Sequence, residues 1–250
     1  MLSAAQSKAI GVFMLLTLAS CGKPATTTSI APLHHTPPLS CGDQAFGHCY
    51  ATSASALPVQ FGSTRFSIAA LNVGTMYMID DEAWLIGSSH ECHQACWLEA
   101  GYDAESKQFA GGSSYFVEWE NEDGDVERVL GPVKSSDIGK TITVTLEINA
   151  PRIGEDRITV WVPSLSGPSV YTFPSAMTAG RFQFGQELAG AGSASAAHAV
   201  FYGLMVGSRS PGAPLLTHVD TSNDPPFAVW LKKPEDAKAG AQFETRCCNE

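Results

Sequence analysis

The chain has 250 residues and a formal net charge of −10. An acidic chain of this kind has no general affinity for phosphate backbones, so we do not expect nucleic acid as a partner. Hydrophobic residues make up 44% of the chain and charged residues 16%, which is sufficient for a sizeable core.

The first twenty residues have the pattern of a secretory signal peptide. Lys8 is their only charge, and an apolar run from Ala9 to Leu18 is too short to span a bilayer. Leu18 to Cys21 resemble a bacterial lipobox, which implies acylation of Cys21 and a lipid anchor in the cell envelope. Gly22 after the cysteine resembles an outer-membrane address. The alternative is an ordinary secreted protein with a cysteine near its cleavage site.

Residues 21–40 are rich in Pro and Thr and have little to bury, which predicts an extended, disordered tether. His34 and His35 lie in this stretch, and we interpret them as solvated residues of a linker rather than metal ligands. Residues 41–250 then predict a single domain, which we expect to be a monomer.

Six cysteines remain apart from Cys21, and an even number in an exported chain predicts disulfide bonds. Six cysteines allow about fifteen connectivities, and the sequence leaves the choice open. We expect adjacent cysteines near the C-terminus to reach different partners, and Cys92 to pair with Cys96 or each of them with one of that C-terminal pair. The six are Cys41, Cys49, Cys92, Cys96, Cys247 and Cys248.

Apolar and polar residues alternate at period two in many short segments, which is typical of half-buried strands. Turn signals such as NEDGD (121–125), which predicts a hairpin, separate them, and no long window has helical periodicity with caps. About nine to twelve strands predict an all-β fold, and we favour an antiparallel β-sandwich over a barrel. The segments are 65–73, 75–80, 114–120, 141–148, 156–162, 169–173, 180–188, 198–206 and 227–231.

Two groups of residues have the chemistry of metal ligands. HECHQAC (90–96) holds two histidines and two cysteines, but its spacing matches no strong zinc pattern, so we predict a disulfide-stapled loop. Carboxylates elsewhere are candidates for a calcium site or for acidic support of a cleft. They belong to Asp81, Glu82, Asp103, Glu118 and Glu120. We predict no metal ion and no cofactor.

Two strand-like segments carry candidate catalytic residues. In CWLEAGYD (96–103), period-two alternation places Glu99 on one face beside Trp97, with Gly101 and Asp103. A carboxyl group near an aromatic ring in a half-dry cleft has a raised pKa and can exchange protons, although a strand glutamate is more commonly just solvated.

In FQFGQE (182–187), the two phenylalanines fall on one face, and Gln183, Gly185 and Glu187 fall on the other. The glycine allows close approach of another backbone or a ligand. The alternative is a strand with a wet outer face. No G-x-S-x-G elbow is present, which argues against a serine hydrolase.

The order of WLEAGYD (97–103), YFVEWE (115–120), DIGKTITVTLEI (137–148) and FQFGQE (182–187) resembles that in the glutamic peptidases, the fungal eqolisins and the plant neprosins. This resemblance spans residues 83–187 and implies a β-sandwich of the concanavalin-like or jelly-roll type. The EAG of Glu99 resembles neprosin's EAG, whose glutamate is catalytic, whereas eqolisins have a catalytic glutamine there.

The same resemblance places the second catalytic residue, a glutamate in both families, on Gln183. AWLIG (83–87) corresponds to an aromatic strand that borders the substrate cleft in eqolisins, which implies that Trp84 lies near the site.

Three hypotheses for function follow. The first is peptide hydrolysis at acid pH, with Glu99 as general base and proton shuttle and Gln183 as oxyanion donor. Its substrate-binding residues would be Trp84, Trp97, Asp103, Glu118 and Glu187. The second is a peptide- or glycan-binding module without catalysis, in which Trp84, Trp97 and Trp119 stack on the ligand. The third is a structural envelope lipoprotein without a cleft.

Overall fold

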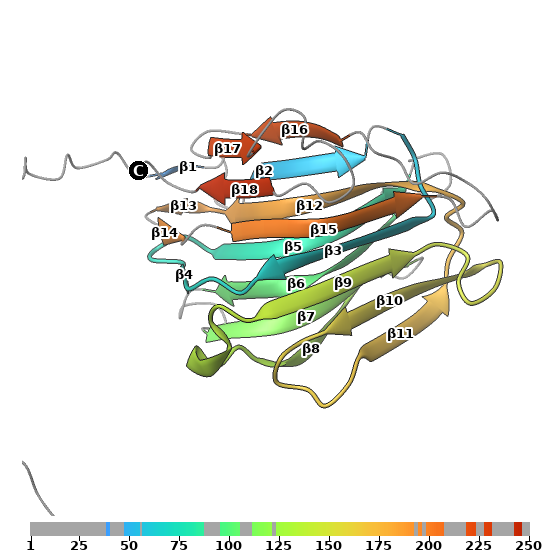
Figure 1. The fold of residues 1–250 in the computed structure, drawn as a ribbon, viewed down its shortest axis with the longest axis horizontal. Helices are drawn as coiled ribbons and strands as arrows, with labels where there is room; N and C mark the ends of the chain where they lie inside the picture. Colours follow the sequence, from blue (N-terminus) through green and yellow to red (C-terminus); the bar gives the residue numbers. More distant parts are fainter. Residues whose placement is uncertain are drawn as a thin grey trace, which may run out of the picture. The chain divides into compact units, whose positions relative to one another are not determined.

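Two seven-stranded antiparallel sheets make up most of the described structure (Figure 1). A computed structural model of the chain describes residues 39–40, 48–55, 57–87, 96–105, 112–121, 124–192, 195–196, 199–207, 219–223, 228–231 and 243–246. Among these residues no helix has the length and apolar character that crossing a bilayer requires.

The first sheet has the order β11-β10-β9-β3-β15-β18-β17. Its strands are β3 (Phe61–Ser67), β9 (Thr141–Glu147), β10 (Glu155–Trp161), β11 (Ser169–Pro174), β15 (Ala199–Gly207), β17 (Ala228–Leu231) and β18 (Phe243–Arg246).

The second sheet has the order β16-β2-β12-β5-β6-β7-β8. Its strands are β2 (His48–Ser55), β5 (Met78–Gly87), β6 (Trp97–Glu105), β7 (Gly112–Asn121), β8 (Gly124–Pro132), β12 (Gly180–Ala189) and β16 (Val219–Asn223). Two short pairs complete the set: β1 (Leu39–Ser40) with β13 (Ala191–Gly192), and β4 (Leu71–Asn72) with β14 (Ser195–Ala196).

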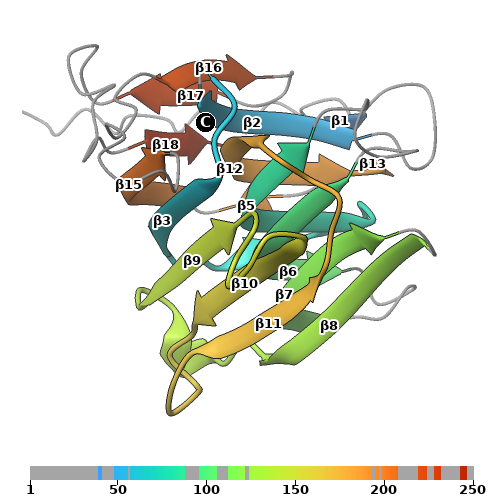
Figure 2. The ribbon, with the colours of Figure 1, turned by 90° about the vertical axis from the view of Figure 1, so that its right-hand side faces the viewer.

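The core lies between the two sheets, which pack face to face (Figure 2). Phe201 of β15 contacts Phe66 of β3 at a ring-centroid distance of 4.9 Å and Phe184 of β12 at 5.6 Å, so rings from both sheets interdigitate. Burying a side chain of this size contributes about 1.5–3 kcal/mol. The predicted antiparallel β-sandwich is confirmed.

The predicted alternation on β6 and β12 is also present. Leu98, Ala100 and Tyr102 of β6 belong to the core, as do Phe182 and Phe184 of β12. The intervening residues therefore face away from the core, on the other side of the sheet.

A buried polar group lies on the core side of the second sheet. Asp81 accepts hydrogen bonds from the hydroxyl of Tyr102 and, at 2.8 Å, from Nε2 of Gln186. The same tyrosine hydroxyl accepts the backbone N–H of Ala69 at 2.7 Å. Burial raises the pKa of Asp81 to about 7, although the two donated hydrogen bonds oppose this shift. The network ties β5, β6 and β12 together from within.

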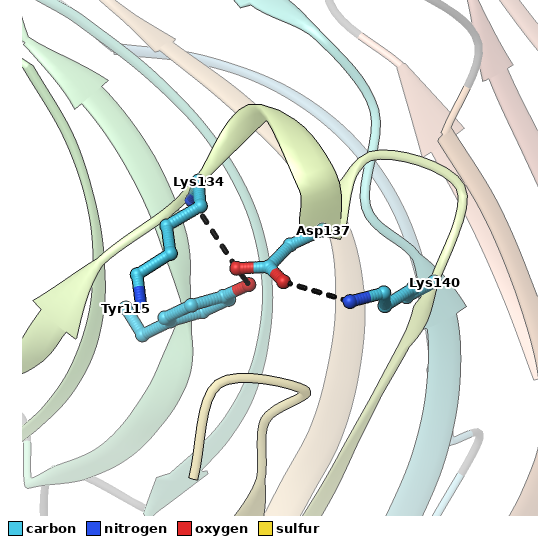
Figure 3. A network of polar contacts seen from close by, with 4 residues as sticks. All are labelled: Tyr115, Lys134, Asp137 and Lys140. Atoms are coloured by element: carbon cyan, nitrogen blue, oxygen red, sulfur yellow. Dashed lines mark hydrogen bonds and ion pairs between the residues drawn. The ribbon is translucent and has the colours of Figure 1, made fainter.

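A second polar network fixes the connection from β8 to β9 (Figure 3). The carboxylate of Asp137, in the 3₁₀ turn Ser135–Asp137, accepts the hydroxyl of Tyr115, the backbone N–H of Lys134 and the ammonium of Lys140, each at 3.2 Å. Burial alone would raise the pKa of Asp137, but these donors outweigh it and hold the pKa below its usual value.

Several predictions concern residues outside the described part of the chain. They concern the signal peptide, the acylation of Cys21, the tether up to residue 38, and the histidines and cysteine of residues 90–95. These predictions are not tested by the structure and stay predictions. The disulfide pairings also stay predictions. Leu39 and Ser40, expected at the end of the tether, form strand β1 instead. The NEDGD hairpin is confirmed by the antiparallel pairing of β7 with β8, in which Asn121 faces Gly124.

Candidate functional site

The outer face of the second sheet carries a row of polar and aromatic side chains across four strands. Gln183 on β12 pairs with Trp84 on β5, Trp84 pairs with Glu99 on β6, and Glu99 pairs with Glu118 on β7. Neighbouring strands lie about 4.8 Å apart, so the backbones at Glu99 and Gln183 are roughly 10 Å apart. Two long polar side chains on this spacing can reach a common water or substrate atom between them.

An aromatic wall covers the neighbouring part of this face. Trp84 meets Tyr50 of β2 edge to face, with ring centroids 6.1 Å apart. These residues lie on strands on either side of β12, so their rings meet across that strand, where Gly185 presents no side chain. A Cβ at this glycine would lie 2.1 Å from the carbonyl oxygen of Ala51, so only glycine allows the close approach of β2.

These side chains line a cleft of about 700 Å³. Its size is within the range of ligand-binding pockets. Among the described residues that line it there are four carboxylates and no lysine or arginine. The lining residues are His48, Tyr50, Thr52, Met78, Trp84, Ile86, Trp97, Glu99, Glu118, Asp125, Gln183 and Glu187.

Most of the site residues predicted from the sequence come together here. The two catalytic candidates, Glu99 and Gln183, line the cleft, as do four of the five predicted substrate-binding residues. Those four are Trp84, Trp97, Glu118 and Glu187.

Asp103 and Trp119 lie elsewhere. Asp103 accepts the backbone N–H of Ser114 at 2.9 Å and its hydroxyl at 2.8 Å, so it holds β6 to β7 and does not line the cleft. Trp119 was predicted to stack on a ligand, which is wrong, because it lies on the core face opposite Leu98. Its ring stacks on Phe173, with centroids 4.6 Å apart and planes 10° apart.

The electrostatics of Glu99 favour its neutral form. Burial raises the pKa of Glu99 to about 8; the contacts with Glu82 and Trp84 oppose this shift, and the charges of Glu187 and Glu118 add to it. Burial likewise raises the pKa of Glu118 to about 7. At acid pH Glu99 is therefore mainly a proton donor, and its carboxylate, the form that acts as a general base, becomes abundant only toward pH 8.

Trp97, which lines the cleft, carries an unpaired hydrogen-bond donor. Its indole N–H is buried and has no partner among the described residues. A buried donor left unpaired costs about 1–3 kcal/mol, which a ligand carbonyl or a water would recover.

His48 and Tyr50 of β2 line the cleft but were not predicted from the sequence. Nδ1 of His48 is hydrogen-bonded to the carboxyl of Glu187. This bond is the main reason that the pKa of His48 is raised. Its ring stacks on Tyr50, with centroids 6.1 Å apart and planes 15° apart. The signal in the sequence was the alternation of His48, Tyr50 and Thr52 with the buried Cys49 and Ala51.

A deeper acidic group lies next to the cleft on β5 and β12. Asp80 and Glu187 pair directly, and Glu82 lies two residues along β5 on the same face. One carboxylate oxygen from each of the three lies within 4.8 Å of those of the other two, which is close enough to share a metal ion. Sequence reasoning included Glu82 and Glu187 but not Asp80, and it grouped Glu82 with Asp81, which faces the core instead.

The comparisons with known proteins found a similar fold but no similar sequence. No protein family model matches the chain, and no curated protein matches it. Several solved structures are similar at low identity, among them the following three. Scytalido-glutamic peptidase with a peptide-based transition state analog has a TM-score of 0.54 at 13% identity, over 84% of this chain and 100% of that chain.

The same peptidase with a transition state analog inhibitor has a TM-score of 0.55 at 14% identity, over 81% of this chain and 100% of that chain. SCP-B, a member of the eqolisin family in a complex with the tripeptide Ala-Ile-His, has a TM-score of 0.52 at 13% identity, over 84% of this chain and 100% of that chain. Likeness at these identities shows the fold alone: the chain is an all-β, concanavalin-like sandwich similar to that of the eqolisins.

Proposed function

We propose that this chain is a bacterial cell-envelope lipoprotein that hydrolyses peptide bonds, with Glu99 as the proton-transferring carboxyl and Gln183 as the donor to the substrate carbonyl oxygen. The observation that carries the proposal is the placement of both residues in one cleft, on either side of Trp84 in a single cross-strand row. The similar eqolisin-type structures hold peptide-type ligands, which supports a polypeptide as the substrate.

The chemistry needs one group that moves a proton and one that stabilises negative charge. The Glu99 carboxylate takes a proton from water as the oxygen attacks the peptide carbon, and the amide of Gln183 donates to the resulting oxyanion. Glu99 then gives the proton to the leaving amine as the C–N bond breaks. An oriented amide donor contributes about 3 kcal/mol in the transition state, and general base catalysis about 10²–10⁴-fold.

The cleft also offers groups that would hold an extended peptide. The unpaired indole N–H of Trp97 suits a backbone carbonyl, and the wall formed by Tyr50 and Trp84 suits an apolar side chain. The absence of lysine and arginine among the described lining residues disfavours acidic substrates.

The test compares cleavage of an unfolded protein by full-length wild type, Glu99→Gln and Gln183→Ala over about pH 3 to 9. The range includes the acid pH expected from the sequence and the region near 8 where Glu99 ionises. We expect a loss of at least about 100-fold in Glu99→Gln and about 10- to 100-fold in Gln183→Ala. Glu155→Gln on β10, in the opposite sheet, is the matched control. Equal rates in all four proteins would sink the proposal.

A second candidate is a peptide-binding module that performs no chemistry. It is favoured by the glutamine at position 183, where the resembling families carry a glutamate, and by the neutral form of Glu99 at acid pH. Saturable binding of a peptide that wild type leaves intact at every pH would select this function.

The lipid anchor at Cys21 has its own test. We expect Cys21→Ala to lose fatty-acid labelling, and unchanged labelling in this variant would exclude the anchor.

A further inference from the structure

The acidic group next to the cleft has the geometry of a cation site. Asp80 and Glu187 face each other across β5 and β12, and Glu82 follows two residues along the same face. One carboxylate oxygen from each of the three lies within 4.8 Å of those of the other two. Calcium binds oxygen at about 2.3–2.6 Å, so two ligands on opposite sides of one ion can lie about 4.6–5.2 Å apart. One ion between the three carboxylates is therefore sterically possible.

The oxygens of this group lack partners that would explain their burial. Asp80 and Glu82 have exposed fractions of 1% and 0%. Oδ1 of Asp80 and both carboxyl oxygens of Glu82 have no hydrogen-bond partner among the described residues. The polar groups beside Glu82 are the carboxyls of Asp80 and Glu99, which can bond to it only by sharing a proton. Buried polar atoms are rarely left in this state, and a bound ion or a proton is a common reason.

The charge around the group is strongly unbalanced. The triad has three carboxylates, Glu99 and Glu118 add further acidic groups on the adjoining strands, and the lining includes no lysine or arginine. The single candidate counter-charge among the described lining residues is His48, which binds Glu187. A divalent cation would neutralise two of the three carboxylates and supply the missing partner of Glu82 at the same time.

We propose that Asp80, Glu82 and Glu187 form a divalent-cation site that takes Ca²⁺. Three carboxylate oxygens are hard ligands, which suit Ca²⁺ or Mg²⁺ rather than zinc or copper. Magnesium demands near-octahedral geometry at about 2.0–2.1 Å, whereas calcium accepts irregular sets of six to eight oxygens. Glu187 lines the open cleft, so water can reach the ion and complete its coordination, and the ion has a path of entry.

Two neighbouring glycines leave room for the carboxylate of Glu82 within the triad. Glu82 lies between two glycines, Gly101 on β6 and Gly185 on β12, its direct cross-strand neighbours. A Cβ at Gly101 would lie 2.6 Å from the Cβ of Glu82, so an alanine there would displace the glutamate. The glycines thus leave the carboxylate of Glu82 room beside the carboxylates of Asp80 and Glu187.

The test is cation binding by the full-length protein, stripped with a chelator, at about pH 7.5, where carboxylates are available as ligands. Tb³⁺ serves as a luminescent probe of the calcium site, because Trp84 lies two residues after Glu82 on the same face and can sensitise its emission. We expect saturable emission that Ca²⁺ displaces. We also expect thermal unfolding to shift upward by about 5–10 °C when Ca²⁺ is at 100 times its Kd.

Isosteric variants locate the site. Asp80→Asn and Glu82→Gln should each weaken Ca²⁺ binding at least about tenfold, whereas Glu118→Gln, a cleft carboxylate outside the triad, should leave it within about twofold. Mg²⁺ should bind at least about tenfold more weakly than Ca²⁺.

Three results would overturn the proposal: no saturable response in wild type, equal affinity in all variants, or equal affinity for both cations. The first needs no variant to fold. All are readouts of binding, so the inference stands or falls independently of peptide hydrolysis.

Discussion

Buried carboxyl groups of this chain differ in whether the fold supplies donors to them. Asp137 has an exposed fraction of 2% but receives three hydrogen bonds, and its pKa stays below the usual value. Asp156 of β10 is fully buried; its Oδ1 accepts the backbone N–H of Asn149 at 3.0 Å, and its Oδ2 has no partner among the described residues. Burial therefore raises the pKa of Asp156 to about 6, against the hydrogen bonds that it does accept.

Asp156→Asn tests this difference. A carboxyl whose pKa is raised on folding stabilises the fold below its unfolded pKa, near 4, and loses that contribution as pH rises through about 6. The shift corresponds to about 2–3 kcal/mol. We expect the free energy of unfolding of Asp156→Asn, relative to wild type, to increase by up to this amount between about pH 4 and 7.5 in urea titrations. Asp125→Asn, at an exposed position, is the control. Parallel pH curves for Asp156→Asn and wild type would contradict the prediction.

Tyr102→Phe tests the network on the core side of β5. The variant removes the donor to Asp81 and the acceptor of the Ala69 N–H, and both of these groups are buried. Each buried group left without a partner costs about 1–3 kcal/mol, so we expect a loss of about 2–4 kcal/mol in the free energy of unfolding. Tyr202→Phe is the matched control, because its hydroxyl bonds Thr141 at an exposed position. Its loss should stay below about 1 kcal/mol. Similar losses in both variants would mean that the buried hydrogen bonds of Tyr102 stabilise the fold no more than the exposed one of Tyr202.

The sequence predicted the site residues that follow from local alternation and missed those that depend on strand pairing. Period-two patterns assign Glu99 and Gln183 each to a face, and the resemblance to the glutamic peptidases singled out both positions. Asp80 was missed because its partner Glu187 lies far away in sequence, and only the pairing of β5 with β12 brings them together. Trp119 was misplaced although the same alternation, counted from Glu118, puts it on the core face.

At the scale of elements, some strands were predicted close to their observed bounds and others were missed. The predicted segments 141–148, 156–162 and 180–188 correspond closely to β9, β10 and β12. Strand β8 was missed because it forms the edge of its sheet and is largely exposed, so it lacks an alternating pattern. Strand β5 was predicted in two pieces because three consecutive acidic residues, 80–82, interrupt its apolar run. Asp80 and Glu82 belong to the acidic group, and Asp81 belongs to the network on the core side. Predictions from the local sequence pattern are expected to fail at such places.

Gly101→Ala tests the close packing of β5 and β6. A Cβ at this position would lie 2.3 Å from the carbonyl oxygen of Asp81 and 2.6 Å from the Cβ of Glu82. Both are parts of the neighbouring strand and cannot turn away, so the strands must separate. We expect a loss of about 1–3 kcal/mol in the free energy of unfolding and weaker Ca²⁺ binding through displacement of Glu82.

Gly167→Ala is the control for this substitution, because a Cβ there meets nothing within 4 Å. It should change the free energy of unfolding by less than about 0.5 kcal/mol. An unperturbed Gly101→Ala would mean that the two strands can accommodate a side chain at this point.

At the scale of the whole molecule, the two sheets have different electrostatic roles. The first sheet supplies one face of the apolar core, and the ion pair of Arg157 on β10 with Glu147 on β9 links two of its neighbouring strands. The second sheet gathers carboxyl groups whose pKa values burial raises. They belong to Asp80, Asp81, Glu82, Glu99, Asp103 and Glu118. We therefore expect folding of the second sheet to take up protons when no cation is bound.

This proton uptake predicts an unusual dependence of stability on pH. Carboxyls with raised pKa values stabilise the fold at low pH and lose that contribution as pH rises through their folded pKa values, here about 7 for Glu118 and about 8 for Glu99. Each contributes on the order of 1–3 kcal/mol. Most proteins are most stable between about pH 5 and 8, but chelator-treated protein should be most stable near pH 4–5 and lose stability steadily up to about pH 8.5. Among the carboxyls that the structure describes, Asp137 opposes this trend, because its donors lower its pKa, and this effect acts below about pH 4.

Thermal unfolding across this pH range measures the effect, and Glu118→Gln serves as its internal control. Removing one titrating group should flatten the slope near pH 7 without altering the midpoint at pH 4.5, where wild-type Glu118 is already neutral. Adding Ca²⁺ at about pH 8 should recover part of the stability that wild type loses, because the ion replaces the protons of Asp80 and Glu82. A midpoint that rises from pH 5 to 8 in chelator would show that the buried carboxyls ionise at their usual pKa values, and that the second sheet is held together without protons or a cation.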